Sequence, residues 1–124
     1  MSLVLIVEDN EKNMKLARDV LQAKGYATLE AVTGEDGLQL AKERKPDLVL
    51  MDIQLPGISG IDVLRQMRAD PGTAKIPVVA LTASVTPSDR TQITQAGFDA
   101  FLGKPIVLKE FLETVQRLTG TKAR

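Results

Sequence analysis

The sequence predicts an α/β fold: a single domain built on a doubly wound, five-stranded parallel sheet with five helices. Three short runs, residues 3–7, 47–51 and 77–82, are apolar at both odd and even positions, as expected for strands that are covered on both faces. Helical patterns with start and stop signals separate these runs along the chain. Short connections and right-handed crossovers then favour a parallel sheet with helices on both faces.

The five predicted strands differ in how apolar they are. LVLIV (3–7), DLVLM (47–51) and PVVALT (77–82) are the most apolar, and we expect them to be buried on both faces of the sheet. ATLEAV (27–32) and DAFLG (99–103) are weaker strands. We therefore expect these two nearer to the edges of the sheet.

The first three helices have clear signals at their ends. The first spans residues 11–24 and can end at Gly25. TGED (33–36), with Thr33 as the N-cap, and SGID (59–62) resemble capping boxes that start the next two helices. The apolar face of the first helix carries Met14, Ala17 and either Val20 or Leu21.

The last two helices are predicted in the same way. TPSD (86–89) puts a proline at the first helical position. Residues 107–119 form the clearest amphipathic pattern in the chain, and Gly120 can end it. The apolar stripe of that helix consists of Leu108, Phe111, Leu112, Val115 and Leu118.

Size and composition limit the possible functions. The 124 residues fit one domain, which we expect at residues 1–120, with a frayed polar tail at 121–124. Lys plus Arg equals Asp plus Glu, and no cationic face for nucleic acid is visible. No apolar run is long enough to cross a bilayer and no signal peptide is present, so a soluble cytoplasmic protein is expected. The absence of Cys and His excludes thiol and imidazole chemistry within the chain.

Polar residues gather where the strands end. Glu8 and Asp9 follow the first strand, Asp52 the third, Thr82 ends the fourth, and Lys104 follows the fifth. Sites in such sheets form at the carboxyl ends of the strands. We therefore expect three carboxylates, a hydroxyl and an ammonium group to converge at one edge.

Three carboxylates in one pocket repel each other, so either their pKa values rise or a cation lies among them. With oxygen ligands alone, the cation should be hard; Mg²⁺ fits best and Mn²⁺ could substitute. Such a metal beside a Lys suits the charge of a phosphoryl group in transfer, and a carboxylate can be the acceptor.

Each of these residues also has a simpler interpretation. Asp9 or Asn10 could cap the first helix, and Asp52 could be an ordinary turn residue. Thr82 is a common strand residue, and Lys104 could be a solvated side chain at a turn. The shared position at one edge of the sheet favours the site over these separate explanations.

The motifs LIVEDN (5–10), DLVLMDIQLPGISG (47–60), PVVALTA (77–83) and LGKPI (102–106) resemble the receiver domains of two-component response regulators. This resemblance covers essentially the whole chain and implies a CheY-like (flavodoxin-like) sheet of strand order 2-1-3-4-5. The combination of NMKL, MDIQLP and KPI is most similar to the stand-alone DivK type.

The resemblance also implies roles for individual residues. Asp52 would be phosphorylated, Asp9 would ligate Mg²⁺ directly, and Glu8 would act largely through a water molecule. The backbone carbonyl of Gln54 would complete the protein ligands. Gln54 and Ser84 stand at the two positions where the family tunes self-hydrolysis.

Further roles concern the response to phosphorylation. Thr82 would hydrogen-bond the phosphoryl oxygens, Lys104 would pair with them, and the Lys104–Pro105 peptide would be cis. On phosphorylation Thr82 would move toward the phosphoryl group and Phe101 would turn inward, remodelling the face formed by helix four, strand five and helix five. Plain core packing is the simpler interpretation of Phe101.

The expected protein is a signalling phosphoacceptor and not an enzyme, although family members catalyse their own phosphorylation and slow dephosphorylation. A histidine kinase or histidine phosphotransfer protein would donate the phosphoryl group, and a downstream protein effector would read it. We expect no direct nucleic-acid partner and no membrane partner, and a monomer or weak dimer. The exposed parts of the first and last helices are docking candidates by family analogy.

Four alternatives stay open. The domain could belong to a hybrid kinase or a longer regulator, or could be a receiver-like scaffold without phosphorylation. A haloacid-dehalogenase-like phosphohydrolase needs an acid two residues after the nucleophile, where this chain has Gln54. A dinucleotide-binding module needs a Gly-rich turn after the first strand, where this chain has VEDNEKN.

Overall fold

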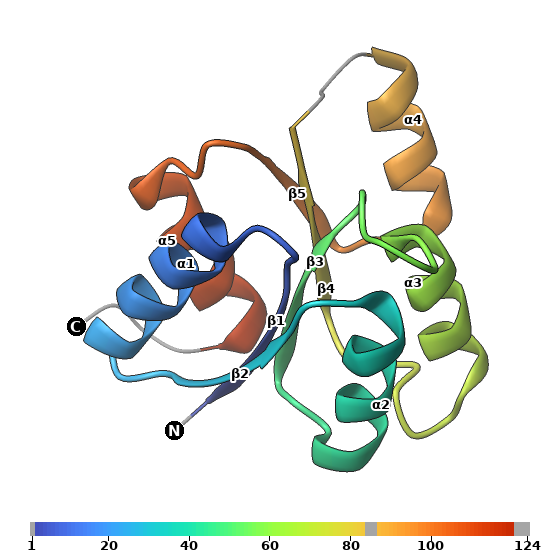
Figure 1. Cartoon of the computed structure of the whole chain (residues 1–124), viewed down its shortest axis with the longest axis horizontal. Helices are drawn as coiled ribbons and strands as arrows, with labels where there is room; N and C mark the ends of the chain where they lie inside the picture. The colour runs from blue at the N-terminus through green and yellow to red at the C-terminus, as the bar shows by residue number, and fades with distance from the viewer. Residues whose placement is uncertain (1, 84–86, 121–124) are drawn as a thin grey trace.

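The computed structural model describes residues 2–83 and 87–120, and it has the predicted α/β architecture (Figure 1). Five parallel strands form one sheet of order β2-β1-β3-β4-β5, so the two weaker strands lie at its edges as predicted. The strands are β1 (Leu3–Val7), β2 (Ala27–Ala31), β3 (Leu48–Asp52), β4 (Val78–Thr82) and β5 (Ala100–Gly103). The helices are α1 (Glu11–Ala23), α2 (Gly34–Arg44), α3 (Gly60–Ala69), α4 (Pro87–Ala96) and α5 (Leu108–Thr119). The tail predicted at 121–124 lies outside the described residues.

Helices cover both faces of the sheet, α1 and α5 on one side and α2, α3 and α4 on the other (Figure 1). The residues of β1 alternate between the two layers: Val4 and Ile6 pack toward α1 and α5, and Leu5 and Val7 toward α2 and α3. Every residue of β3 and β4 is buried. Burial on both faces explains why these strands are apolar at successive positions.

The helix starts follow the predicted signals. Thr33 and Ser59 accept hydrogen bonds from the third backbone N–H beyond them, at 3.1 and 3.2 Å. Asn10, one of the two candidate caps of α1, accepts from the backbone N–H of Asn13 at 3.0 Å. At the other end of the chain, Gly120 has a φ of 72° and terminates α5.

The start of α5 lies at the surface. Leu108, the first residue of the predicted apolar stripe, is 51% exposed, and the preceding Val107 is 56% exposed. Phe111 and Val115 are fully buried, so the helix enters the apolar layer only one turn after it begins. The helical period of the sequence shows on which side of the helix a residue lies. It does not show where the apolar layer that α5 packs against ends.

Two glycines hold the loop after β3 against the sheet and α2. A Cβ at Gly60 would meet the backbone oxygen of Asp52, and one at Gly34 would lie 2.7 Å from the backbone oxygen of Ile58. The backbone N–H of Gly60 also donates to the carbonyl of Ile53 at 3.1 Å. These contacts fix residues 53–59 directly beside the end of β3. Among the described residues, no helix is long and apolar enough to cross a membrane.

Candidate functional site

The ends of β1 and β3 bring the predicted acidic residues together. The two strands are parallel neighbours with Val7 beside Met51, so Glu8 and Asp52, the next residues, lie side by side. One carboxylate oxygen from each of Glu8, Asp9 and Asp52 lies within 4.8 Å of the others. The convergence of three carboxylates, predicted from strand ends, is therefore present in the structure.

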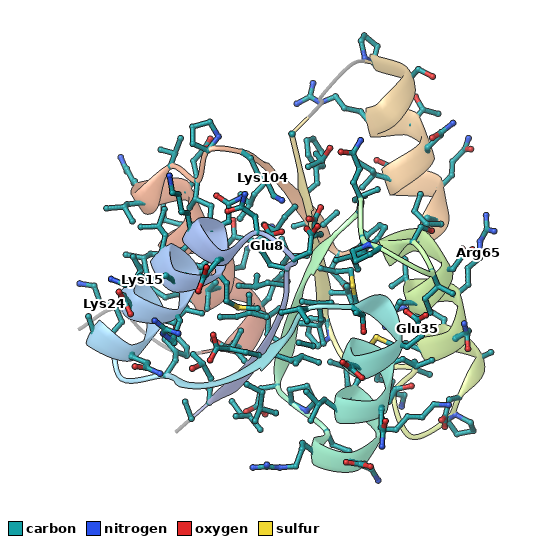
Figure 2. The ribbon with its side chains drawn as sticks, viewed as in Figure 1. Glu8, Lys15, Lys24, Glu35, Arg65 and Lys104 are labelled. Atoms are coloured by element: carbon teal, nitrogen blue, oxygen red, sulfur yellow. The ribbon has the colours of Figure 1, made fainter. Side chains whose placement is uncertain are left out.

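Lys104, the residue after β5, completes the cluster. Its Nζ lies 2.6 Å from Oε1 of Glu8 and 3.0 Å from Oδ2 of Asp52. Figure 2 shows Glu8 and Lys104 at the same end of the sheet. The backbone N–H of Lys104 donates to the carbonyl of Thr82 at 2.9 Å, and the Lys104–Pro105 peptide is cis, the isomer implied by the resemblance.

The cluster is buried on one side and open on the other. Glu8 is 1% exposed and Asp52 is 4% exposed, whereas Asp9 is an exposed residue. Backbone N–H groups orient the buried carboxylates: Gln54 donates to Oδ1 of Asp52 at 3.0 Å, and Asn10 donates to Oε2 of Glu8 at 3.3 Å. A ligand would therefore reach Asp52 from the side of Asp9.

Burial and crowding change the protonation of the cluster. The pKa of Glu8 is raised from 4.5 to about 7, first by burial and then by its side-chain contact with Asp52, while Lys104 lowers it in part. Burial alone would lower the pKa of Lys104, but its contacts with the carboxylates of Glu8 and Asp52 together outweigh burial and raise it. Lys104 thus stays charged, whereas Glu8 is about half protonated near pH 7, and a bound cation would displace that proton.

The donor set fits a hard divalent cation. Oε1 of Glu8 is buried and has no hydrogen-bond partner, because its 2.6 Å contact with the Lys104 ammonium is an ion pair outside hydrogen-bond geometry. All candidate ligands are oxygens, and the chain has no His or Cys. Oxygen-only sets favour Mg²⁺ or Mn²⁺ over zinc. The three carboxylates could therefore hold Mg²⁺.

The remaining predicted residues lie around this cluster. Thr82 is the last residue of β4, is 5% exposed, and stands opposite Gly103 of β5. The side chain of Gln54 is exposed, and Ser84 lies outside the described residues. Phe101 is half-buried on β5, and the guanidinium carbon of Arg90 lies 5.0 Å from the centre of its ring.

Two contacts were not predicted from the sequence: the guanidinium of Arg90 on the ring of Phe101, and the Lys104 ammonium that bridges both buried carboxylates. Arg90 belongs to α4 and Phe101 to β5, and no local pattern in either segment marks such a pair. A cation 11 positions before an aromatic residue gives no signal until the fold is known.

Residues 4–116 match the response regulator receiver domain family. The polar-differentiation response regulator DivK of Brucella anthropi is 46% identical over 117 residues, which cover 94% of this chain and 95% of that protein. DivK of Brucella ovis has the same identity and coverage.

Solved structures show the same relationship. The receiver domain of the sensor histidine kinase PA1611 of Pseudomonas aeruginosa, with magnesium coordinated in its active-site cleft, has a TM-score of 0.89 at 32% identity and covers 96% of this chain and 98% of that one. The chemotaxis protein CheY4 of Vibrio cholerae has a TM-score of 0.88 at 25% identity and covers 95% and 98%. The chain therefore belongs to the response regulator receiver domains of two-component signalling.

Proposed function

We propose that the protein is a phosphoacceptor switch in which Asp52 receives a phosphoryl group from the phosphohistidine of a partner protein. The observation that carries this proposal is the position of Asp52. Its carboxylate is buried at the end of β3, is oriented by the backbone N–H of Gln54, and contacts the Lys104 ammonium at 3.0 Å. A carboxylate held in this way can act as an oxygen nucleophile.

In the transfer, a carboxylate oxygen of Asp52 forms a bond to phosphorus as the phosphorus–nitrogen bond of the donor breaks. The bonding electrons pass to the imidazole nitrogen, which takes up a proton, and an acyl phosphate remains on Asp52. Mg²⁺, held by Glu8, Asp9, Asp52 and the carbonyl of Gln54, would supply charge neutralisation for the phosphoryl oxygens. Lys104 pairs with one of these oxygens, and the hydroxyl of Thr82 donates to another.

The switch works through Thr82 and Phe101. When Thr82 turns toward the phosphoryl group it leaves space at the end of β4, and the ring of Phe101 moves inward to fill it. Phe101 is half-buried, and the guanidinium carbon of Arg90 lies 5.0 Å from the centre of its ring; this partial exposure supports the proposal that the unphosphorylated chain holds the ring in an outward state. Phosphorylation of Asp52 thereby shifts the equilibrium between the outward and inward arrangements of Phe101.

The donor and the reader of the signal lie outside this domain. The domain has no His, so we propose that the phosphohistidine belongs to a sensor kinase or a phosphotransfer protein. The movement of Phe101 alters the surface formed by α4, β5 and α5. We expect a protein effector to bind this output face. We expect the chain to act as a monomer or a weak dimer.

Incubation with acetyl phosphate and Mg²⁺, followed by intact mass measurement, tests the proposal. We expect one added phosphate (~80 Da), absent in Asp52→Asn and in EDTA, because the acceptor is one metal-dependent carboxylate. Asp62→Asn is the matched control, since Asp62 is exposed on α3. An unmodified mass for a folded chain would indicate a scaffold. Rapid release of phosphate from many small esters would indicate a hydrolase instead.

A further inference from the structure

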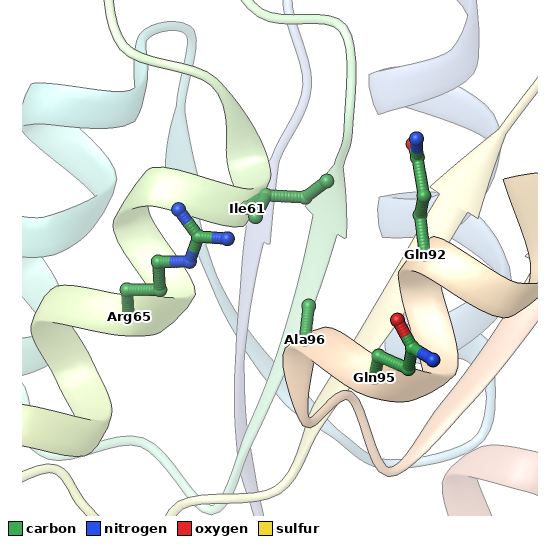
Figure 3. Close-up of a pocket in the computed structure, with 5 residues that line it drawn as sticks. All are labelled: Ile61, Arg65, Gln92, Gln95 and Ala96. Carbon is green, nitrogen blue, oxygen red and sulfur yellow. The ribbon is translucent and has the colours of Figure 1, made fainter.

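A hollow of about 540 Å³ lies between α3 and α4, away from the carboxylate cluster. Its lining consists of Ile61, Arg65, Gln92, Gln95 and Ala96. Figure 3 shows Ile61 and Arg65 on α3, facing Gln92, Gln95 and Ala96 on α4. We call this feature the α3–α4 groove. Its volume is in the range of sites that hold small ligands or short peptide segments.

The groove exists because of the residues on α4. Ile93 is buried in the core, but the neighbouring positions that line the groove are two Gln residues and a small Ala. On the other side of α3, by contrast, a Cβ at Gly34 of α2 would come within 2.9 Å of Val63. Thus α3 packs closely against α2 and leaves a polar space toward α4.

The polar groups of the groove are available to a ligand. Within residues 2–83 and 87–120, the guanidinium of Arg65 and the carboxamides of Gln92 and Gln95 have no hydrogen-bond or ion-pair partner. No acid is among the described lining residues, so the local charge is that of Arg65. Ile61 and Ala96 are half-buried against the core and provide an apolar floor.

One guanidinium, two carboxamides and an apolar floor together indicate which class of ligand the groove can bind. A guanidinium pairs best with a carboxylate or phosphate. Each carboxamide offers both donors and an acceptor, which match the C=O and N–H groups of a peptide backbone, whereas a bare anion would leave the acceptors unused. One cation is too few for a nucleic-acid backbone, which is bound by neutralising several phosphates. The exposed large apolar side chains, Leu16, Val32, Val107 and Leu108, are not among the groove residues.

We infer that the α3–α4 groove binds a short acidic peptide segment of a partner protein. A Glu or Asp side chain of that segment pairs with Arg65, its backbone bonds to Gln92 and Gln95, and an apolar side chain lies on Ile61 and Ala96. The inference does not depend on phosphorylation of Asp52, because every group that it uses lies outside the carboxylate cluster.

The test is an NMR titration of the ¹⁵N-labelled, unphosphorylated chain in EDTA. The probe is a pool of N-acetylated, C-amidated pentapeptides with Glu at the centre and random flanking residues, and the matched pool has Gln at the centre. We expect the Glu pool to shift the side-chain resonances of Arg65, Gln92 and Gln95. The Gln pool should bind roughly tenfold more weakly, because it lacks the charge-assisted pair.

Three substitutions test whether the peptides bind in the α3–α4 groove. Arg65→Gln should weaken binding of the Glu pool roughly tenfold, since it removes only the cation of an exposed side chain. Arg44→Gln, which removes another exposed guanidinium at the end of α2, should leave binding unchanged. Ala96→Met should block the groove, and its thermal melt shows whether the variant is folded.

Three results would overturn the inference. They are equal shifts by the two pools, shifts confined to residues outside the groove, and unchanged binding in Arg65→Gln. Shifts of the groove resonances that depend on protein concentration without peptide would identify a second copy of the chain as the occupant.

Discussion

Without a bound cation, ionisation of Glu8 should weaken the fold. Its pKa rises from 4.5 to about 7 on folding, first because of burial and then because of the hydrogen bond with Asp52. Between these two values the unfolded chain has released a proton that the folded chain still holds. The free energy of unfolding therefore falls as the pH rises through this window. The loss is nearly complete about one pH unit above the folded-state pKa of about 7, and it amounts to about 3 kcal/mol.

Glu8→Gln keeps the size of the side chain and removes the titration. At pH 8 the free energy of unfolding of this variant should exceed that of the unchanged chain by about 3 kcal/mol, and the difference should shrink toward zero below pH 4.5. That figure already includes the attraction between Glu8 and Lys104, which opposes the effects of burial and Asp52. Removing a buried negative charge thus stabilises the metal-free protein.

Urea unfolding, followed by circular dichroism in EDTA from pH 4.5 to 8, measures this difference. Glu113→Gln is the matched control, because Glu113 is exposed on α5 and should give no pH-dependent difference. A Glu8→Gln variant that is less stable than the unchanged chain at pH 8 would refute the reasoning. So would a difference that does not vary with pH.

The other predictions concern the metal, the ammonium, the switch and the loop. Mg²⁺ at 100 times its dissociation constant should raise the free energy of unfolding by about 2.7 kcal/mol, and Asp9→Asn should lose most of this gain in the same urea assay. Lys104→Ala should retain some phosphorylation by intact mass but show weaker phosphorylation-dependent binding of an effector; full dependence would contradict its role. Arg90→Ala removes a cation–π contact of about 0.5–1 kcal/mol, so ring shifts of ¹⁹F-labelled Phe101 should move toward the inward state without phosphate. Gly60→Ala should cost about 1–3 kcal/mol in urea unfolding, because the new Cβ meets the backbone of Asp52.

The strands and most helix starts could be predicted because they depend on local chemistry. Val4 to Val7 are apolar at successive positions since both faces of β1 are covered. Thr33 and Ser59 start helices because their side chains satisfy backbone N–H groups three residues on. The exposure of Leu108 could not be predicted, because exposure at a helix end depends on where the adjacent layer stops, which the helical period does not encode.

The carboxylate cluster could be predicted as a set but not in its internal geometry. Strand ends placed Glu8, Asp9 and Asp52 at one edge, and the structure brings them within 4.8 Å. That Lys104 contacts Glu8 more closely than Asp52 depends on rotamers and on the register of strands far apart in the chain. The α3–α4 groove likewise depends on the distance between two helices, which no single segment determines.

Chemical mapping of the phosphorylated residue tests the central claim most directly. After incubation with acetyl phosphate and Mg²⁺, borohydride reduces an acyl phosphate to the alcohol, so an aspartyl phosphate is read as homoserine by peptide mass mapping. We predict homoserine at position 52 alone, and none when EDTA is present. Homoserine at another position, or a folded chain with no modified peptide under these conditions, would contradict the account.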